Sequence, residues 1–523
     1  MKAILRSGFL ALAVMLALAV PANAGPYEDA VAAYERGDYA GALKFWRPLA
    51  DQGLAEAQYN IGVMYAIGRG VSQDNVLAHM WFDLAAVQGH EQAQQRRDIA
   101  ARMMTPGQIA AAQHNLGFMY EKGLGLPQDY VEAVGWYRKA AERGYAEAQH
   151  NLGLMNEKGL GVPQDFVRAH MWFNLAVAHV HEEAKQDRNR TAGLMAPDQI
   201  ATAQTNLGYM YETGRGIPKD YAEAVKWYRR AAEQGSARAQ FNLGQIYRRG
   251  EGVPQDYGEA VKWYRMAAER GHARAQNSLG LRYATGQGVP RDYTEAVKWY
   301  RMAAEQGYVY AQSNLGLRYA SGQGVPQDAA EAVKWYRMAA EQGHAGAQNS
   351  LGLMYAKGQG VPQDDAEAVK WNRMAAERGH AEAQSKLGLR YANGQSVPQD
   401  DAEATKWYRM AAEQGDARAQ FNLGFMYYYG RGVPRDYAEV VKWYRKAAEQ
   451  GHARAQYNLG VMYRRGRGVP QDDALAYMWS YLAAAQGDMS ARRTRGTMAK
   501  RMTPDQIAEA QQMACEWMPK HQR

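Results

Sequence analysis

The chain has 523 residues and carries 62 Lys and Arg against 54 Asp and Glu, a formal net charge of +8. With 47% apolar and 22% charged residues, it is too hydrophobic to be a disordered chain. A single cysteine excludes a disulfide scaffold, a Cys-based zinc site and a CxxC redox centre. Because the charge excess is small for this length, we do not expect nucleic acid as a partner.

Residues 1–24 have the pattern of a signal peptide. Lys2 and Arg6 precede an apolar stretch at residues 8–20, and Ala22 and Ala24 give the small-x-small pattern that signal peptidases cut. This pattern predicts cleavage after Ala24 and a periplasmic or secreted protein. The apolar stretch is shorter than the roughly 20 residues that span a bilayer, so we do not expect a membrane-spanning protein.

Residues 25–57 are predicted to form N-terminal capping helices. Residues 38–46 resemble the second helix of the repeats that follow, but this segment has no Gly-Pro loop.

Residues 58–477 consist of tandem repeats with a period of 36 residues. Tryptophan recurs at this spacing from Trp227 to Trp479, and glutamine does so from Gln204 to Gln456. The spacing is 55 residues from Trp81 to Trp136 and again from Trp172 to Trp227, which predicts extended units near residues 90–110 and 181–201. In total there are eleven repeats.

Each repeat is predicted to contain two helices, A and B. In one repeat, helix A is expected over residues 204–213 and ends at Gly214. Asp220 is predicted to cap helix B, with Glu223 completing a capping box. A single helix pair cannot bury its apolar face, so we expect stacking into an all-α, α/α solenoid, a right-handed superhelix of about eleven helix-pair repeats with N- and C-terminal caps.

Residues 478–523 are predicted to be a third extended unit and a capping helix, in which Ile507, Ala510, Ala514 and Trp517 form an apolar stripe. The last 60 residues hold ten Lys or Arg against six acids. Such a basic end is usually a solvated face, and contact with anionic lipid or polysaccharide is the alternative.

The repeat motif resembles a known family. Residues 239–247, 250–257 and 259–265 look like the Sel-one-like repeat, a relative of the tetratricopeptide repeat. Local departures are Ser72, Asn156, Asn372 and Ser396, where other repeats have Pro, Tyr, Tyr and Gly. The resemblance implies a non-catalytic binding scaffold, often exported by bacteria, with a protein or peptide partner in the cell envelope.

Function in a solenoid should depend on positions at which the repeats differ. If the recurring glutamine is position 0, positions 1, 5 and 8 face away from the core of helix A, and the resemblance implies that this side lines a concave groove. Off-pattern aromatic and charged residues there are the candidate binding residues, with contacts between adjacent repeats as the alternative: Phe421, Phe425, Tyr428, Tyr429, Tyr457, Arg464, Arg465, Arg248, His114 and His150.

Two further positions on helix A left alternatives open. Position 5 is mostly apolar, for which packing is preferred over an apolar peptide groove. Position 6 holds Arg282, Arg318 and Arg390, which are expected to lie along an apolar face. The alternative is that these arginines form a row that binds an acidic partner.

Catalytic motifs are absent from the sequence, and no catalytic residue or cofactor is predicted. One group resembles a metal site: His170, His179, His181, Glu182 and Glu183. However, His181 occupies a turn position that is histidine in several other repeats, so no metal is predicted. Alternatives to the scaffold are a β-lactamase-like envelope hydrolase, which is disfavoured because its cysteine-rich relatives pair cysteines within each repeat, and non-catalytic binding of polysaccharide or cell wall.

Overall fold

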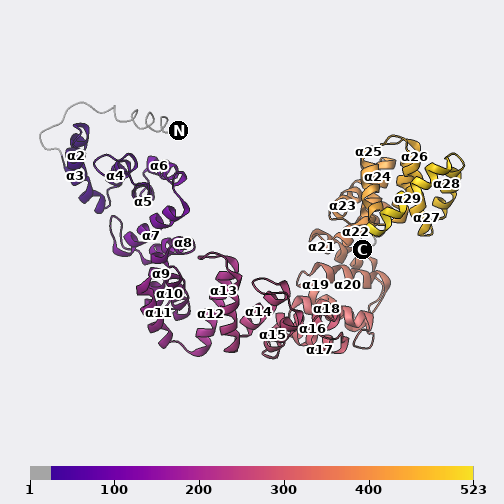
Figure 1. The fold of residues 1–523 in the computed structure, drawn as a ribbon, viewed down its shortest axis with the longest axis horizontal. Coiled ribbons are helices and arrows are strands. Elements are labelled where there is room, and N and C mark those ends of the chain that lie inside the picture. Colours follow the sequence, from indigo (N-terminus) through magenta and orange to yellow (C-terminus); the bar gives the residue numbers. More distant parts are fainter. Residues whose placement is uncertain (1–24, 522–523) are drawn as a thin grey trace. The chain divides into compact units, whose positions relative to one another are not determined.

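A computed structural model describes residues 25–521, so the predicted signal peptide lies outside the described residues. From residue 25 to 521 the chain forms 28 helices and no strands (Figure 1). The predicted all-α architecture of stacked helix pairs is therefore confirmed. The chain divides into two compact units, one ending at Ala267 and the other beginning at Ala268, and each is described by itself.

The first unit contains the helices up to α15, whose last residues pass the boundary. These helices are α2 (Pro26–Glu35), α3 (Tyr39–Asp51), α4 (Ala55–Ile67), α5 (Asn75–Val87), α6 (Glu91–Arg102), α7 (Pro106–Lys122), α8 (Tyr130–Ala141), α9 (Ala146–Lys158), α10 (Phe166–Ala178), α11 (Glu182–Gly193), α12 (Pro197–Thr213), α13 (Tyr221–Glu233), α14 (Ala237–Arg249) and α15 (Tyr257–Glu269).

The second unit contains the most regular repeats and the C-terminal helices. Its helices are α16 (Ala273–Thr285), α17 (Tyr293–Glu305), α18 (Val309–Ser321), α19 (Ala329–Glu341), α20 (Ala345–Lys357), α21 (Asp365–Glu377), α22 (Ala381–Asn393), α23 (Asp401–Glu413), α24 (Ala417–Tyr429), α25 (Tyr437–Glu449), α26 (Ala453–Arg465), α27 (Asp473–Ala485), α28 (Met489–Ala499) and α29 (Pro504–His521).

Helix B starts at an aspartate cap, as predicted. The carboxylate of Asp220 accepts the backbone N–H groups of Ala222 and Glu223 at 2.9 and 3.0 Å. The capping box itself is not formed, because the Glu223 carboxylate instead lies 2.5 Å from the ammonium of Lys226. Capping by one aspartate satisfies two of the otherwise unpaired N–H groups at the helix start.

Helix A ends as predicted but begins earlier in the extended units. Gly214 has φ +74°, the left-handed conformation that glycine adopts without a Cβ clash. Helix α12 begins at Pro197 rather than at residue 204, because the inserted segment continues into helix A without a break.

A tyrosine and a glycine set the distance between the two helices of a repeat. A Cβ placed on Gly208 of α12 would lie 2.6 Å from the ring of Tyr228 on α13, so only glycine allows this approach. Tyr228 is fully buried, and the same pair recurs as Gly244 with Tyr264. Small residues thus admit close helix packing around the aromatic rings.

The recurring glutamine is buried and joins helix A to the preceding helix B. In α14, Gln240 donates through Nε2 to the carbonyl oxygen of Ala232 at 2.9 Å, which also accepts the backbone N–H of Gly235 at the end of α13. The glutamine therefore repeats because it joins helix A to the end of the preceding helix B inside the core.

In the extended units a third helix covers helix B. Helix α10 packs against both α11 and α12, and α27 packs against α28 and α29. Arg230 of α13 is exposed, whereas its counterparts Leu175 in α10 and Leu482 in α27 are buried. The ordinary repeats carry Lys, Arg or Met at this position, and leucine takes their place where the inserted helix removes it from water.

At the C-terminus, the ring of Trp517 in α29 packs edge-on against Trp479 of α27, with centroids 5.6 Å apart. Cys515 on the same helix is exposed. Among the residues from 25 to 521, no helix combines the length and the hydropathy needed to cross a bilayer.

Candidate interaction surface

Position 5 of helix A carries large apolar side chains that are exposed in five consecutive repeats of the second unit. Their exposed fractions lie between 36 and 46%, and the residues, here called the helix A stripe, are Leu281, Leu317, Leu353, Leu389 and Phe425. The preference for packing at position 5 is thus wrong for these repeats.

Three of the predicted aromatic residues come together at the end of α24, next to the stripe. The ring of Tyr429 lies 4.5 Å from that of Phe425 and 4.9 Å from that of Tyr428. Tyr429 is exposed, whereas Tyr428 accepts a hydrogen bond of 3.1 Å from Arg467. Arg464 and Arg465 follow one repeat later, on α26, where Arg464 is half-buried and Arg465 exposed.

Position 1 lies between adjacent repeats. Phe421 stacks on Tyr444 of helix B and on His452, which caps the following helix A, with ring centroids 5.6 and 4.8 Å away. His114 contacts Tyr137 and Tyr145 in the same way, and Tyr457 packs against Ala483, Ala484 and Ala491. These contacts match the alternative in which position 1 joins neighbouring repeats.

The arginines on helix A lie along their own repeats. Arg248 is half-buried, and its Nε donates to Gln245 of the same helix at 3.0 Å. Arg318 donates to the loop residue Gln323 at 2.5 Å, and Arg282 donates to Gln287 at the equivalent place. Their guanidinium groups thus contact the loop that follows helix A.

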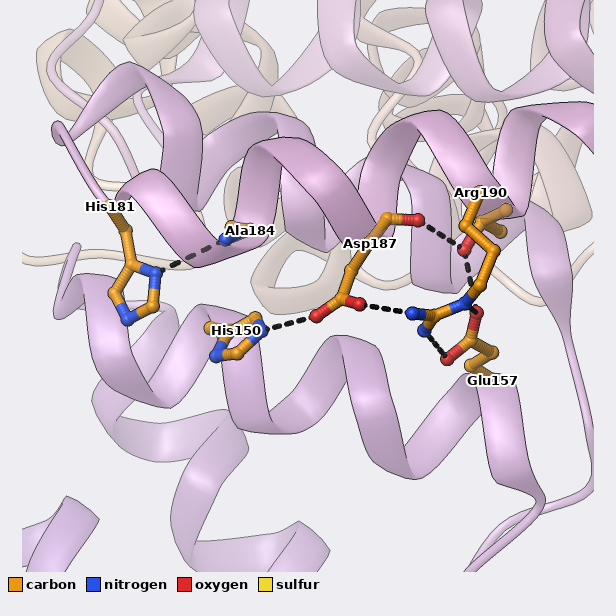
Figure 2. Close-up of polar contacts among 7 residues, drawn as sticks. His150, Glu157, His181, Ala184, Asp187 and Arg190 are labelled. Atoms are coloured by element: carbon orange, nitrogen blue, oxygen red, sulfur yellow. Dashed lines mark hydrogen bonds and ion pairs between the residues drawn. The ribbon is translucent and has the colours of Figure 1, made fainter.

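His150 belongs to a polar cluster that fixes the inserted helix α11 on α9 (Figure 2). Its Nε2 lies 2.7 Å from the carboxylate of Asp187, which can only accept, so Nε2 donates. Arg190 of α11 bridges Asp187 and Glu157, with both contacts at 2.5 Å. Thr191 adds a bond of 2.9 Å to Glu157.

The cluster keeps its carboxylate ionised. Burial acts to raise the pKa of Asp187, but the hydrogen bonds from His150 and Arg190 outweigh burial and lower it. The result is an alternating chain of donors and acceptors between α9 and α11. Because each charged side chain in the cluster has a partner, the cluster can hold α11 in place on α9.

The predicted metal-like group is divided by the fold. His170 lies 3.3 Å from the carbonyl oxygen of Arg188, and His179 lies 3.0 Å from the amide oxygen of Gln149. The residues that could hold a metal are instead His150, His181 and Glu183, whose ligand atoms lie within 4.8 Å of one another. Sequence reasoning did not place His150 in the metal-like group, because it is distant along the chain from His181 and Glu183.

Capping opposes metal binding at His181. Its Nδ1 accepts the N–H of Ala184 at 3.3 Å, which places the proton on Nε2. A metal on Nε2 requires that nitrogen to be unprotonated, and a neutral imidazole has only one such nitrogen. A metal here would therefore cost helix α11 its N-cap.

Comparison with known proteins identifies the repeat. The model of the Sel1 repeat matches eleven segments, which make up well over half of the chain: 55–90, 110–145, 146–181, 201–236, 237–272, 273–308, 309–344, 345–380, 381–416, 417–452 and 453–488. The chain belongs to the Sel1 repeat family. Sel1 repeat proteins are protein-interaction scaffolds, and no enzyme family matches this chain.

A solved Sel1-like repeat structure has a similar fold over most of the chain. The protein c5321, a protective antigen present in uropathogenic Escherichia coli strains, is 34% identical, with a TM-score of 0.60 over 92% of this chain and 95% of that one. Two fungal relatives match in part. The chitin synthase regulator SKT5 of Malassezia restricta is 32% identical over 18% of this chain. The chitin synthase regulatory factor 3 of Schizosaccharomyces pombe is 31% identical over 38%. The alignments span 8% and 22% of these relatives' lengths.

Proposed function

We propose that this Sel1 repeat protein is an exported scaffold that binds an extended segment of a protein partner along the helix A stripe. The observation that carries the proposal is the exposure of a large apolar side chain at the same position of five consecutive repeats. A contiguous exposed apolar surface is typical of interaction sites. Because the stripe has one side chain in each repeat, an extended segment of a partner that lies along it gains one apolar contact per repeat.

The aromatic end of the stripe supplies an anchor. Phe425 and Tyr429 present exposed rings in contact with each other, and tyrosine is among the residues that contribute most to binding energy at interfaces. We therefore place the strongest contact at α24, with the leucines of α16, α18, α20 and α22 extending the surface.

Export is supported by the signal-peptide pattern of residues 1–24, and we place the partner in the cell envelope. Amino-terminal sequencing of the protein recovered from periplasm and culture medium tests this placement. A mature chain that begins at Gly25 supports export, whereas an intact Met1 in a purely cytoplasmic pool contradicts it.

Binding along the stripe is tested by photo-crosslinking with matched positions. A photo-reactive amino acid replaces Leu317 on helix A or Met338 on helix B, both of which are exposed. In periplasm we expect a protein adduct from position 317 that is absent from position 338. The triple variant Leu281→Ser, Leu353→Ser, Leu389→Ser should abolish the adduct, while Met302→Ser with Met410→Ser should leave it. Adducts of equal yield from both positions would contradict the proposed surface.

A further inference from the structure

We propose that the repeat at residues 345–380 contains a pocket for a tyrosine side chain of the partner segment. This inference rests on the proposed function, because two leucines of the helix A stripe form the walls of the pocket. The pocket arises from a substitution inside the core, at Asn372 of α21.

In the neighbouring repeats a tyrosine ring fills the corresponding space. The ring of Tyr336 lies against Gly316, and that of Tyr408 lies against Gly388, each 2.8 Å from where a Cβ would stand. In the repeat between them Asn372 takes the place of the tyrosine and faces Gly352 with its amide oxygen. Asparagine is much smaller than tyrosine, while glycine is retained, so the space is not filled from within.

A cavity is present at this place, with a volume of about 450 Å³. Asn372 lines it together with Leu353 and Ala356 of α20 and with Leu389 of α22. Because Leu353 and Leu389 are both exposed, the cavity opens on the face that carries the stripe. A side chain of a segment bound along the stripe can therefore enter it.

Asn372 carries an unused acceptor beside this cavity, with its Oδ1 turned toward Gly352. The residue is 3% exposed, and its Oδ1 has no hydrogen-bond partner among the residues that the structure describes. A buried polar atom without a partner destabilises the protein, and a ligand that donates a hydrogen bond to it removes that cost. The occupant should thus carry an O–H or N–H group at its inner end.

The charges at the rim are already balanced. Lys386 lies 2.8 Å from Glu382 and 3.1 Å from the amide oxygen of Asn349. Arg390 lies 3.7 Å from Asp365. A neutral group fits these surroundings better than a carboxylate or phosphate, which would have to displace an existing partner.

A phenol meets each of these requirements. Its ring suits the apolar walls, and its hydroxyl can donate to Oδ1 of Asn372 once rotation of the amide turns that oxygen from Gly352 toward the cavity. The protein itself places tyrosine rings in the equivalent space, where the hydroxyl of Tyr228, for example, donates to Glu212 at 2.7 Å. Position 8 is Ala356 in this repeat, so the space beside the missing ring is open on that side as well.

The test uses p-cresol, the side chain of tyrosine, and toluene, which lacks the hydroxyl, in ligand-detected NMR titrations of the full chain. We expect p-cresol to bind at least about tenfold more tightly than toluene, because toluene leaves Oδ1 unpaired. Asn372→Tyr should fill the pocket from inside and abolish p-cresol binding without lowering Tm. Asn372→Leu keeps space but removes the acceptor, so its preference for p-cresol should fall to about twofold or less.

Equal p-cresol binding by the wild type and by Asn372→Tyr would overturn the pocket. The proposed function is judged separately, from the crosslink at position 317. If that adduct forms in wild type and Asn372→Tyr leaves its yield unchanged, the stripe binds a partner but the tyrosine pocket is wrong. If the adduct is absent and p-cresol binds in the expected pattern, the pocket stands and the proposed surface fails.

Discussion

The side-chain amide of Gln149 donates a hydrogen bond of 2.6 Å to the carbonyl oxygen of Gly216, 67 residues further along the chain. The same nitrogen also donates to the carbonyl oxygen of Ala141 at 3.1 Å, and the backbone N–H of Gly216 donates to Glu142. Gln58 and Gly125 form the same tie in the first extended unit, at 2.8 Å. In each case the loop after a long helix is fixed across the inserted helix.

Gln149→Leu should release this loop, because the buried carbonyl oxygen of Gly216 loses its side-chain donor, whereas that of Ala141 keeps the N–H of Gly144. A loss of about 2 kcal/mol corresponds to roughly 30-fold faster hydrogen exchange in residues 214–219, measured by mass spectrometry. Gln312→Leu is the matched control, since Gln312 donates to a single carbonyl of the preceding helix. Unchanged exchange at residues 214–219 in Gln149→Leu would show that the tie does not hold the loop.

Histidine caps make the stability of the array depend on pH. Six helices begin at a histidine whose Nδ1 accepts the backbone N–H three residues on: His90, His181, His272, His344, His380 and His452. Protonation removes this acceptor. Burial, as the largest cause, lowers the pKa of His344, His380 and His452. Because the unfolded chain binds protons first, stability is complete above about pH 6.5 and falls as the pH drops toward the folded pKa values.

We therefore expect Tm to fall between about pH 7.5 and about pH 5.5, at about 1 kcal/mol per lost cap. The triple variant His344→Asp, His380→Asp, His452→Asp supplies the control, because Asp416 and Asp488 already cap the same position with bonds of 2.7 and 2.9 Å. Differential scanning calorimetry should show a smaller pH dependence in this variant. An identical pH profile would contradict the role of the caps.

Val180→Gly should raise stability. Val180 has φ +65°, whereas the equivalent turn positions in other repeats, such as Gly144 and Gly235, are glycine. The left-handed conformation costs a β-branched residue about 1–2 kcal/mol. Glycine removes this cost, but it also raises the conformational entropy of the unfolded chain, which cancels part of the stabilisation. Since Val180 is 82% exposed, no packing is lost.

The expected net gain for Val180→Gly is about 0.5–1 kcal/mol, seen as a higher Tm in thermal unfolding followed by circular dichroism. Ser396, at φ +57°, offers a second test in the other unit, and Ser396→Gly should act in the same direction. A lower Tm in both variants would mean that the surroundings, and not the backbone, set the cost.

Leu175→Arg should disrupt the second extended unit, although arginine stands at the equivalent position of α13. Leu175 is fully buried, so an arginine there loses its hydration without gaining a partner, at a cost of about 3 kcal/mol or more. Arg230→Leu, the reverse change at an exposed site, should be neutral within about 0.5 kcal/mol. Limited proteolysis near residues 181–201 should cleave Leu175→Arg faster than Arg230→Leu. Equal protection of the two variants would show that burial does not set the cost of a charge at this position.

The sequence predicted the elements that are determined locally. Gly214 and Asp220 mark a helix end and a helix start through their own backbone and side-chain chemistry, so no knowledge of neighbours was needed. The constant spacing of Trp and Gln likewise gave the register of the repeats, because it can be read along the chain without knowledge of spatial neighbours. The inserted helices also left a signal that was not used, since Leu175 and Leu482 stand where ordinary repeats carry Lys, Arg or Met.

The candidate surface was predicted less well, because it depends on what covers a residue. The helical period correctly separates the two sides of helix A, but it cannot show that Leu317 stays exposed while the rings of Tyr444 and His452 pack on Phe421. The pairing of His150 with Asp187 depends on how α11 docks on α9. Asn372 was visible as a departure from the motif, yet the cavity exists only because Gly352 opposite it was kept.

The 67-residue tie of Gln149 to Gly216 also determines where such a gene can change its length. Between α16 and α25 the repeats share one period and one set of contacts, so unequal recombination can add or delete 36 residues and rebuild each junction. A break between residues 149 and 216 separates the two partners of the tie. Growth of the array is therefore confined to the regular repeats, and each added copy lengthens the helix A stripe by one apolar side chain.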